Sequence, residues 1–281
     1  MRLEDFCRIL EVSTSGFYAW KARQNKPNKS RALVTEKTIL DEMKSFRKKH
    51  HFTPGVRQFH AYLQSKQLKV GLKRLRRVLR GNGFIGYKRR CRVKTTDSNH
   101  RLAVYPNLLN REFQSGEIDR AWVSDITYLP TQEGFVYLAS IIDVGSRCLL
   151  GWAMDTSMTV ELVQKAFKRA LDICGKRCIP GAVFHSDQGS QYCSHAFQNT
   201  LRAAQMRTSM SRKGECWDNA VAESFWNTVK REVLGARRRF LSISEAIEST
   251  EEWISYYNTQ KPHSAIRMMA PLAYEAQLSN R

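Results

Sequence analysis

The sequence predicts an α/β fold, a mixed five-stranded sheet flanked by helices, preceded by an all-helical basic domain with a helix-turn-helix-like outline. Two observations lead to this prediction. Apolar residues recur at helical spacing up to about residue 95 and alternate at strand spacing after residue 120. The charge changes in the same region, since residues 1–120 carry 28 Lys+Arg against 10 Asp+Glu and residues 121–281 carry 18 against 16. A basic helical part therefore precedes a nearly neutral α/β part.

The composition of the 281-residue chain excludes several classes of protein. Hydrophobic residues make up 42%, which is enough for a packed core. No apolar run of about 18 residues predicts a membrane span, and the first residues lack a secretory pattern, so we expect a cytoplasmic protein. The seven cysteines show no zinc-site spacing, which predicts reduced thiols. The net charge of +20, concentrated in the front part, indicates a module that binds a polyanion.

The first predicted segment, residues 1–29, contains two short helices joined by a tight turn. Residues 3–10 have helical spacing, Gly16 is expected in the turn, and residues 17–23 predict an aromatic and basic helix. This arrangement is the outline of a helix-turn-helix. A polar stretch then separates it from a long polar helix at about residues 30–50.

A basic helical domain of helix-turn-helix type is predicted over residues 30–95. Two of its helices are expected at 56–65 and 72–80. In the last helix the apolar residues face a core, so the basic side chains point outward, and phosphates lying against them would relieve their repulsion. The candidate phosphate-binding residues are Lys73, Arg74, Arg76, Arg77 and Arg80, with Lys88, Arg89 and Arg90 continuing the charge toward a linker at 96–119.

The last predicted domain, residues 120–281, has the pattern of a sheet with alternating helices and ends in a C-terminal helix. Strands are predicted at 121–129, 135–144, 148–154, 180–187 and 207–210. Three helices are predicted before the C-terminal helix. The first begins at Thr159, its expected N-cap, the second spans 194–205, and the third runs from about 218 to 234. Three strands followed by alternating helices and strands are typical of a mixed sheet that begins with an antiparallel part.

Three acidic residues stand where a carboxylate needs a reason. Asp125 lies in the middle of the first predicted strand, where aspartate is disfavoured and an unpaired buried charge costs several kcal/mol. Asp187 lies at the end of the fourth strand, where side chains of α/β sheets line a crevice. Glu223 lies on the predicted helix 218–234 between apolar residues, which predicts a place near the margin of the core.

A site made of three carboxylates would be anionic and would offer oxygen ligands only. Such a site suits Mg²⁺ or Mn²⁺ and does not suit Zn²⁺. Two ions about 3.5–4 Å apart can activate a water or a 3′-hydroxyl and stabilise the leaving oxygen of an in-line displacement at phosphorus. Each carboxylate alone has an ordinary explanation, in a turn or on a solvated helix. Together they predict that Asp125, Asp187 and Glu223 are catalytic residues that bind two divalent ions.

Several motifs resemble the OrfB-type transposases of bacterial insertion sequences. They are HSDQGSQY (185–192), SMSRKGECWDNAVAESFW (209–226) and YYNTQKPHSAI (256–266), and WVSDITYL (122–129) resembles the family's first catalytic strand. Asp187 and Glu223 are separated by 35 residues, the spacing expected of that family. The family belongs with retroviral integrases in the acidic-triad superfamily, so the resemblance implies a ribonuclease-H-like core. It covers roughly residues 30–275.

The resemblance implies roles for individual residues. Asp125, Asp187 and Glu223 would be the metal ligands. Lys230 stands seven residues after Glu223, about two helical turns on, and would contact the end of the element. Residues 256–258 with His263 and Ser264 are expected to pack the C-terminal helix onto the core. Two roles stay open for a further four residues, which either orient ligands or DNA or act as structural caps: His185, Gln191, Asn219 and Asn227.

The resemblance also implies what the protein acts on and with. It predicts a transposase that cuts and joins DNA at terminal inverted repeats and at a target, as a homo-oligomer on DNA. The family's partner protein, encoded by an upstream reading frame, is absent from this chain. A bacterial cytoplasmic protein that associates with the nucleoid when bound is expected. Two alternatives stay open at this point: a catalytically inactive DNA-binding protein derived from a transposase, and a ribonuclease of the same fold.

Overall fold

The computed structural model describes residues 3–9, 11–25, 34–84, 100–114, 116–175, 180–212, 215–235, 237 and 239–279. Three of the predicted phosphate-binding residues, Lys88, Arg89 and Arg90, lie outside these ranges. Within the described residues, no helix is long and apolar enough to cross a membrane. The four cysteines whose side chains are described, Cys7, Cys148, Cys174 and Cys193, are buried.

The C-terminal part of the molecule is built around a mixed sheet of five strands. Their order is β3-β2-β1-β4-β5, with antiparallel pairing from β1 to β3 and parallel pairing between β1, β4 and β5. The bounds are β1 (Ala121–Thr131), β2 (Gly134–Asp143), β3 (Leu149–Asp155), β4 (Val183–Ser186) and β5 (Arg207–Met210). The predicted mixed sheet is confirmed, and β4 is shorter than the eight residues expected. The strand that carries Asp125 lies in the middle of the sheet.

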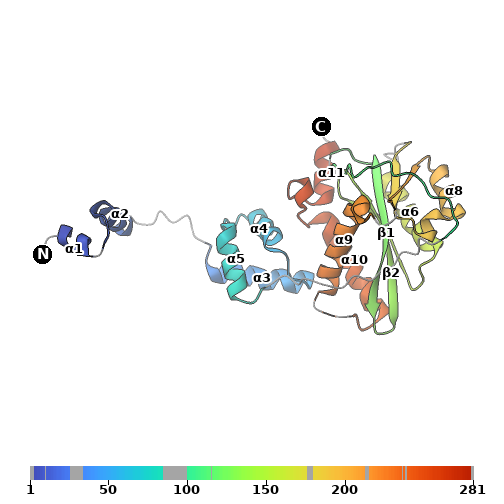
Figure 1. Cartoon of the computed structure of the whole chain (residues 1–281). Coiled ribbons are helices and arrows are strands. Elements are labelled where there is room, and N and C mark those ends of the chain that lie inside the picture. The colour runs from blue at the N-terminus through green and yellow to red at the C-terminus, as the bar shows by residue number, and fades with distance from the viewer. Residues whose placement is uncertain are drawn as a thin grey trace.

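Helices cover both faces of this sheet, which gives three layers (Figure 1). α6 (Val160–Cys174), α7 (Ser190–Cys193) and α8 (His195–Ala203) cover one face; α9 (Ala220–Val229), α10 (Ile243–Thr259) and α11 (Pro271–Ser279) belong to the other side. Thr159 is the N-cap residue of α6, although its side chain makes no capping hydrogen bond. α6 lies so close to β3 that a Cβ at Gly151 would stand 2.1 Å from the carbonyl oxygen of Ala166. Only glycine fits there.

The predicted helix 218–234 is one helical stretch with three geometries. A 3₁₀ turn at Cys216–Asn219 leads into α9, and a π-helical turn follows at Lys230–Leu234. π turns are rare, and they change which side chains share a face.

α10 is attached to β3 by Asn258, whose side chain bonds both the backbone N–H and the carbonyl of Leu149 at 3.0 and 2.9 Å. The expected packing of the residue 256–258 motif onto the core is confirmed.

The front of the chain is helical, as predicted, with two corrections. α1 (Leu3–Ile9) and α2 (Thr14–Asn25) form the first pair, and Gly16 lies inside the first turn of α2. The placement of Gly16 in the loop was wrong because the Ser13 hydroxyl accepts the Gly16 N–H at 3.1 Å, so the helix begins earlier. α3 (Glu36–His50) starts later than residue 30, because Thr35 caps it by accepting the N–H of Thr38 at 3.1 Å.

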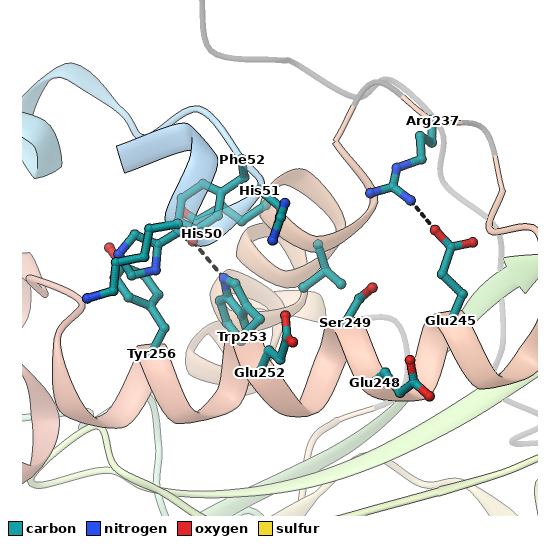
Figure 2. Close-up of a pocket in the computed structure, with 13 residues that line it drawn as sticks. His50, His51, Phe52, Arg237, Glu245, Glu248, Ser249, Glu252, Trp253 and Tyr256 are labelled. Atoms are coloured by element: carbon teal, nitrogen blue, oxygen red, sulfur yellow. Dashed lines mark hydrogen bonds and ion pairs between the residues drawn. The ribbon is translucent and has the colours of Figure 1, made fainter. Parts of the chain in front are cut away.

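The remaining front helices, α4 (Val56–Ser65) and α5 (Leu72–Gly81), pack with α3 and share a buried cluster with α10. Figure 2 shows this junction, where His50 and Phe52 lie against Tyr256 of α10. The His50 ring is 4.4 Å from the Tyr256 ring between centroids, and Gln58 Nε2 donates to the Tyr256 hydroxyl at 2.9 Å. Aromatic and amide contacts of this kind attach the basic helices to the core.

Candidate active site

Asp125 lies on β1, and Asp187 directly follows the neighbouring parallel strand β4. β1 and β4 pair with Val123 opposite His185, so the same register continued by two residues sets Asp125 beside Asp187. Neighbouring strands are about 4.8 Å apart, which brings the two side chains within reach of one cation. Both residues line one small cavity, together with Ile126, Met158, Gly189, Gln191 and Tyr192. The two predicted aspartates therefore line the same cavity.

Helix α9 brings a third carboxylate to the same side of the sheet. Trp226 Nε1 donates a hydrogen bond to Asp125 Oδ2 at 3.0 Å, which attaches α9 to β1 at this point. Glu223 lies one turn earlier on α9 and is exposed, so its expected place at the core margin is wrong. Ala222, Phe225 and Trp226 are the buried residues of this helix. They leave Glu223 on the solvent side, where a metal or DNA can reach it.

The three carboxylates act on one another electrostatically. Burial raises the pKa of Asp125, and the negative charges of Asp187 and Glu223 raise it further. The same burial and the charges of Asp125 and Asp187 raise the pKa of Tyr192, whose hydroxyl lies 2.8 Å from the Ser124 hydroxyl. Like charges gathered in a half-buried site are costly without a cation. The site is therefore electrostatically suited to a positive ligand.

The donor atoms fit a hard divalent ion. Burial, and then the charge of Asp187, raises the pKa of the nearby Cys193 thiol to about 11, so this thiol stays protonated. His185 uses both ring nitrogens in hydrogen bonds to serines. Carboxylate oxygens remain as the ligands on offer, which suits Mg²⁺ or Mn²⁺. The three carboxylates do not form a closed set of ligands, because over the described ranges no group of three or more histidine, cysteine, aspartate or glutamate side chains lies close enough together to hold an ion.

His185 lies on β4, between β1 and β5 in the sheet. It is fully buried, with Nδ1 2.8 Å from the Ser209 hydroxyl and Nε2 3.2 Å from the Ser211 hydroxyl. This position connects β4 to β5 just before Asp187. Burial lowers the pKa of His185 to about 4, so the ring is neutral at physiological pH. A fully buried ring cannot touch DNA directly, and its contacts fit a positioning role.

We expect His185→Asn to lose stability in a pH-dependent way. The unfolded chain protonates His185 below about pH 6.5, whereas the folded chain resists protonation down to about 4. The stability that His185 contributes is therefore present above pH 6.5 and is lost as the pH falls to 4, by at most about 1.4 kcal/mol per pH unit. Denaturant unfolding of wild type and variant should show a difference of about 1–3 kcal/mol at pH 7.5 that shrinks at pH 5. An equal difference at both pH values would contradict this.

The other three supporting residues take different positions. Gln191 lines the cavity of the two aspartates and donates from Nε2 to the Met158 carbonyl at 3.0 Å. Asn219 is buried and donates to the Ser124 carbonyl at 3.4 Å, which connects the start of α9 to β1. Asn227 is exposed on α9, one turn after Glu223. Gln191 and Asn219 thus make structural contacts next to the site, and Asn227 faces solvent.

Lys230 lies where α9 changes to π geometry. Its Nζ stands over the Tyr128 ring of β1, 4.9 Å from the ring centre. A cation over an aromatic face is attracted by the ring and held in place. On α5, Lys73, Arg76, Arg77 and Arg80 are exposed while Leu75, Val78 and Leu79 are buried; Arg74 is half-buried. The predicted outward orientation is confirmed for these four side chains.

A buried ion-pair network lies before α9 and was not predicted from the sequence. The Asp218 carboxylate is buried and accepts from Arg111 Nε at 2.7 Å and from Arg212 Nε at 2.9 Å. Hydrogen bonds from Arg212, and then from Arg111, hold the pKa of Asp218 well below its usual range. This network fixes the segment between β5 and α9. The acidic residue at the start of a helix was the one sign of this network in the sequence. Its partner Arg111 lies 107 positions away, so spacing could not reveal the pair.

Two models of an integrase core domain match this chain, over residues 117–216 and 204–271. Together they span the sheet and α9 to the start of α11, so the sheet and site described above belong to an integrase core. A solved relative in shape, the HTLV-2 integrase catalytic core in complex with magnesium, covers 57% of this chain and 99% of its own at 14% identity, with a TM-score of 0.44.

Curated relatives match nearly the whole chain. A 31 kDa protein of insertion element IS600 from Shigella sonnei is 38% identical over 95% of this chain and 96% of its own length. The transposase of IS904 from Lactococcus lactis is 34% identical over 88% of this chain and 96% of its own length. The transposase InsF of IS3A from Escherichia coli is 31% identical over 97% of this chain and 93% of its own length. The chain therefore belongs to the insertion-sequence transposases with an integrase core domain, and it is a DNA transposase.

Proposed function

We propose that this transposase cuts and joins DNA with a two-metal site held by Asp125, Asp187 and Glu223. One observation carries the proposal: β1, the end of β4 and α9 bring three carboxylates within electrostatic reach of one another, at the carboxyl end of the sheet's central parallel pair. The ions would be Mg²⁺ or Mn²⁺, two per site, because the ligands are carboxylate oxygens. The proposed substrates are the terminal inverted repeats of the element and a target DNA.

The protein side chains supply binding and position. When bound, the ions supply Lewis acidity to the attacking and leaving oxygens of the phosphodiester. Asp125 and Asp187 would hold them from the sheet, and Glu223 would close the site from α9. The Gly189 N–H donates to Asp187 Oδ1 at 2.9 Å and Trp226 donates to Asp125 at 3.0 Å, so both aspartates are oriented before any metal arrives. Preorganised ligands of this kind lower the cost of reaching the reactive geometry.

The basic residues are proposed to hold DNA. Lys230, beside β1 and close to the site, would contact a phosphate at the element's end. The exposed face of α5, with Lys73, Arg76, Arg77 and Arg80, would contact phosphates farther along the duplex, with Arg74 at its margin. Lys88, Arg89 and Arg90 would extend this contact. We further propose that the protein works as a homo-oligomer on DNA, with an upstream-frame partner protein.

The proposal is tested by a Mg²⁺-dependent cleavage and strand-transfer reaction on the terminal inverted repeats, taken from the DNA that flanks the gene. The wild-type protein is compared with Asp187→Asn. Loss of both steps in the variant supports the proposal. Full activity of the variant would refute the proposal that Asp187 is a metal ligand.

Trp226→Phe should raise the Mg²⁺ concentration needed for half-maximal cleavage by about 10-fold. The phenylalanine fills most of the same space but cannot donate to Asp125, so this carboxylate is no longer held in its position. Changes to the partners of metal ligands cost about 10–100-fold in metal affinity or activity. The measurement is a Mg²⁺ titration of cleavage together with a metal-induced shift in the unfolding temperature.

The control for Trp226 is Trp253→Phe on α10. That indole also donates to a carboxylate, Glu232 Oε2 at 2.9 Å, but lies in the core behind α9. Trp253→Phe should lower stability and leave the Mg²⁺ requirement unchanged. An unchanged requirement in Trp226→Phe would show that this indole does not position Asp125.

A further inference from the structure

A second cavity lies along α9, away from the aspartates, and its charged walls are all basic. It has a volume of about 550 Å³ and is lined by Ser224, Phe225 and Thr228 of α9, by residues of α4, and by the turn after α10. Five basic side chains line it, Arg57, Arg147, Arg231, Lys261 and His263. No aspartate or glutamate is found among its described lining residues. A cavity walled in this way attracts anions.

Arg147 is the central observation. Its side chain is buried, with 6% of its surface exposed, although it carries a positive charge. Nη2 donates to the Phe113 carbonyl at 2.6 Å, but Nε and Nη1 are buried without a hydrogen-bond partner. Buried donors of a charged group are rarely left unpaired, because the lost hydration is costly. Burial also lowers the pKa of Arg147, a sign of the same cost.

The carboxylates behind the wall do not cancel the charge. Glu232 accepts two hydrogen bonds from Lys261 Nζ at 2.7 and 2.9 Å and one from Arg231 at 3.0 Å. Asp143 is close enough to affect Arg147, but its oxygens already accept the Asp119 and Ser146 N–H groups and the Ser146 hydroxyl. Glu232 is thus shared by Lys261 and Arg231, and Asp143 is occupied by donors other than Arg147.

His263 reports the same excess. Burial, and then the charges of Arg147 and Lys261, lower its pKa to about 4, so the ring is neutral and sits in a positive field. A group with several negatively charged oxygens would reverse this field and give the free N–H groups of Arg147 an acceptor. Arginine offers donors in a planar fork that matches phosphate oxygens.

We propose that this cavity binds a backbone phosphate of the DNA on which the transposase acts. This inference rests on the DNA-joining function proposed above and adds a site to it. Two of the α9 residues that line the cavity, Val221 and Ser224, flank the position of Glu223 on the same helix. A phosphate held here anchors the duplex on one side of α9, while the carboxylates act on the other. Its role is to position the DNA, and it takes no part in the chemical step.

The test is a DNA-binding measurement across a series of KCl concentrations. The probe is a duplex with the element's terminal inverted repeat, and a scrambled duplex of equal length is used in parallel. The variants are Arg147→Gln and Arg57→Gln; Arg57 is exposed, so its replacement leaves the core intact. The matched control is Arg202→Gln, an exposed arginine of α8 on the other side of the sheet.

Each cavity variant should bind the repeat duplex about tenfold more weakly. The slope of log affinity against log salt should fall by about 0.9 for the lost phosphate contact. Arg202→Gln should match the wild type in both. If Arg147→Gln does not fold, Arg57→Gln alone decides. Wild-type slope and affinity in a folded variant would overturn the phosphate site while leaving the carboxylate proposal intact. Failure of the wild type to bind either duplex would overturn the DNA-joining proposal itself.

Discussion

Asp187→Asn is expected to abolish DNA cleavage and strand transfer, a loss of at least about a thousandfold. Replacing a partner of a metal ligand already costs about 10–100-fold, and Asp187 is proposed to be a ligand itself. Asparagine keeps the side-chain oxygen that accepts the Gly189 N–H, so the loop after β4 should keep its shape. The change therefore removes one negative charge and little else.

The measurement is the amount of nicked and joined product from terminal-repeat DNA in Mg²⁺. Asp172→Asn is the matched control, because Asp172 is an exposed aspartate of α6 far from the carboxylate site in the fold. It should leave both steps at the wild-type level. DNA binding by Asp187→Asn should also persist, which separates chemistry from recognition. Wild-type product formation by Asp187→Asn would refute its role as a metal ligand.

Lys261→Met is expected to destabilise the folded protein by about 3 kcal/mol. Lys261 and Glu232 form a buried ion pair, with side chains 8% and 1% exposed. Removing the lysine leaves the Glu232 charge buried with only Trp253 and Arg231 as donors. Breaking a buried pair from one side costs about 3–5 kcal/mol, and the two remaining donors place the effect at the lower end.

Denaturant unfolding at neutral pH measures this difference. Lys66→Met is the control, because Lys66 pairs with Glu42 at 2.7 Å but its side chain is 43% exposed. An exposed pair contributes about 0–1 kcal/mol. Lys261→Arg keeps the positive charge and should stay closer to the wild type than Lys261→Met. A Lys261→Met variant as stable as Lys66→Met would show that Glu232 is not dependent on Lys261.

Much of the core could be predicted because its information is local. The alternation of apolar residues gave β1, and an aspartate in the middle of that strand had no structural reason to be there. Asp187 follows a short apolar run and so was placed at a strand end. These two positions, with the parallel pairing of β1 and β4, are enough to bring the aspartates together.

The remaining features depend on contacts that spacing alone cannot give. Trp226 and Asp125 are 101 positions apart, and nothing near either residue indicates their hydrogen bond. Lys230 keeps its helical spacing from Glu223, because its N–H still bonds the Trp226 carbonyl, but nothing in the sequence indicates the π-helical turn that follows at Lys230–Leu234. The unpaired donors of Arg147 appear only once β2, α10 and the turn after it are assembled. Each of these is a product of the tertiary fold.

The most direct test of the metal site is anomalous diffraction from Mn²⁺ in crystals of the protein with terminal-repeat DNA. We predict two Mn²⁺ peaks about 3.5–4 Å apart, with oxygens of Asp125, Asp187 and Glu223 about 2.1 Å from them. A DNA-engaged structure with the Glu223 carboxyl group more than about 10 Å from both aspartates, well beyond any metal–oxygen bond, would contradict the account.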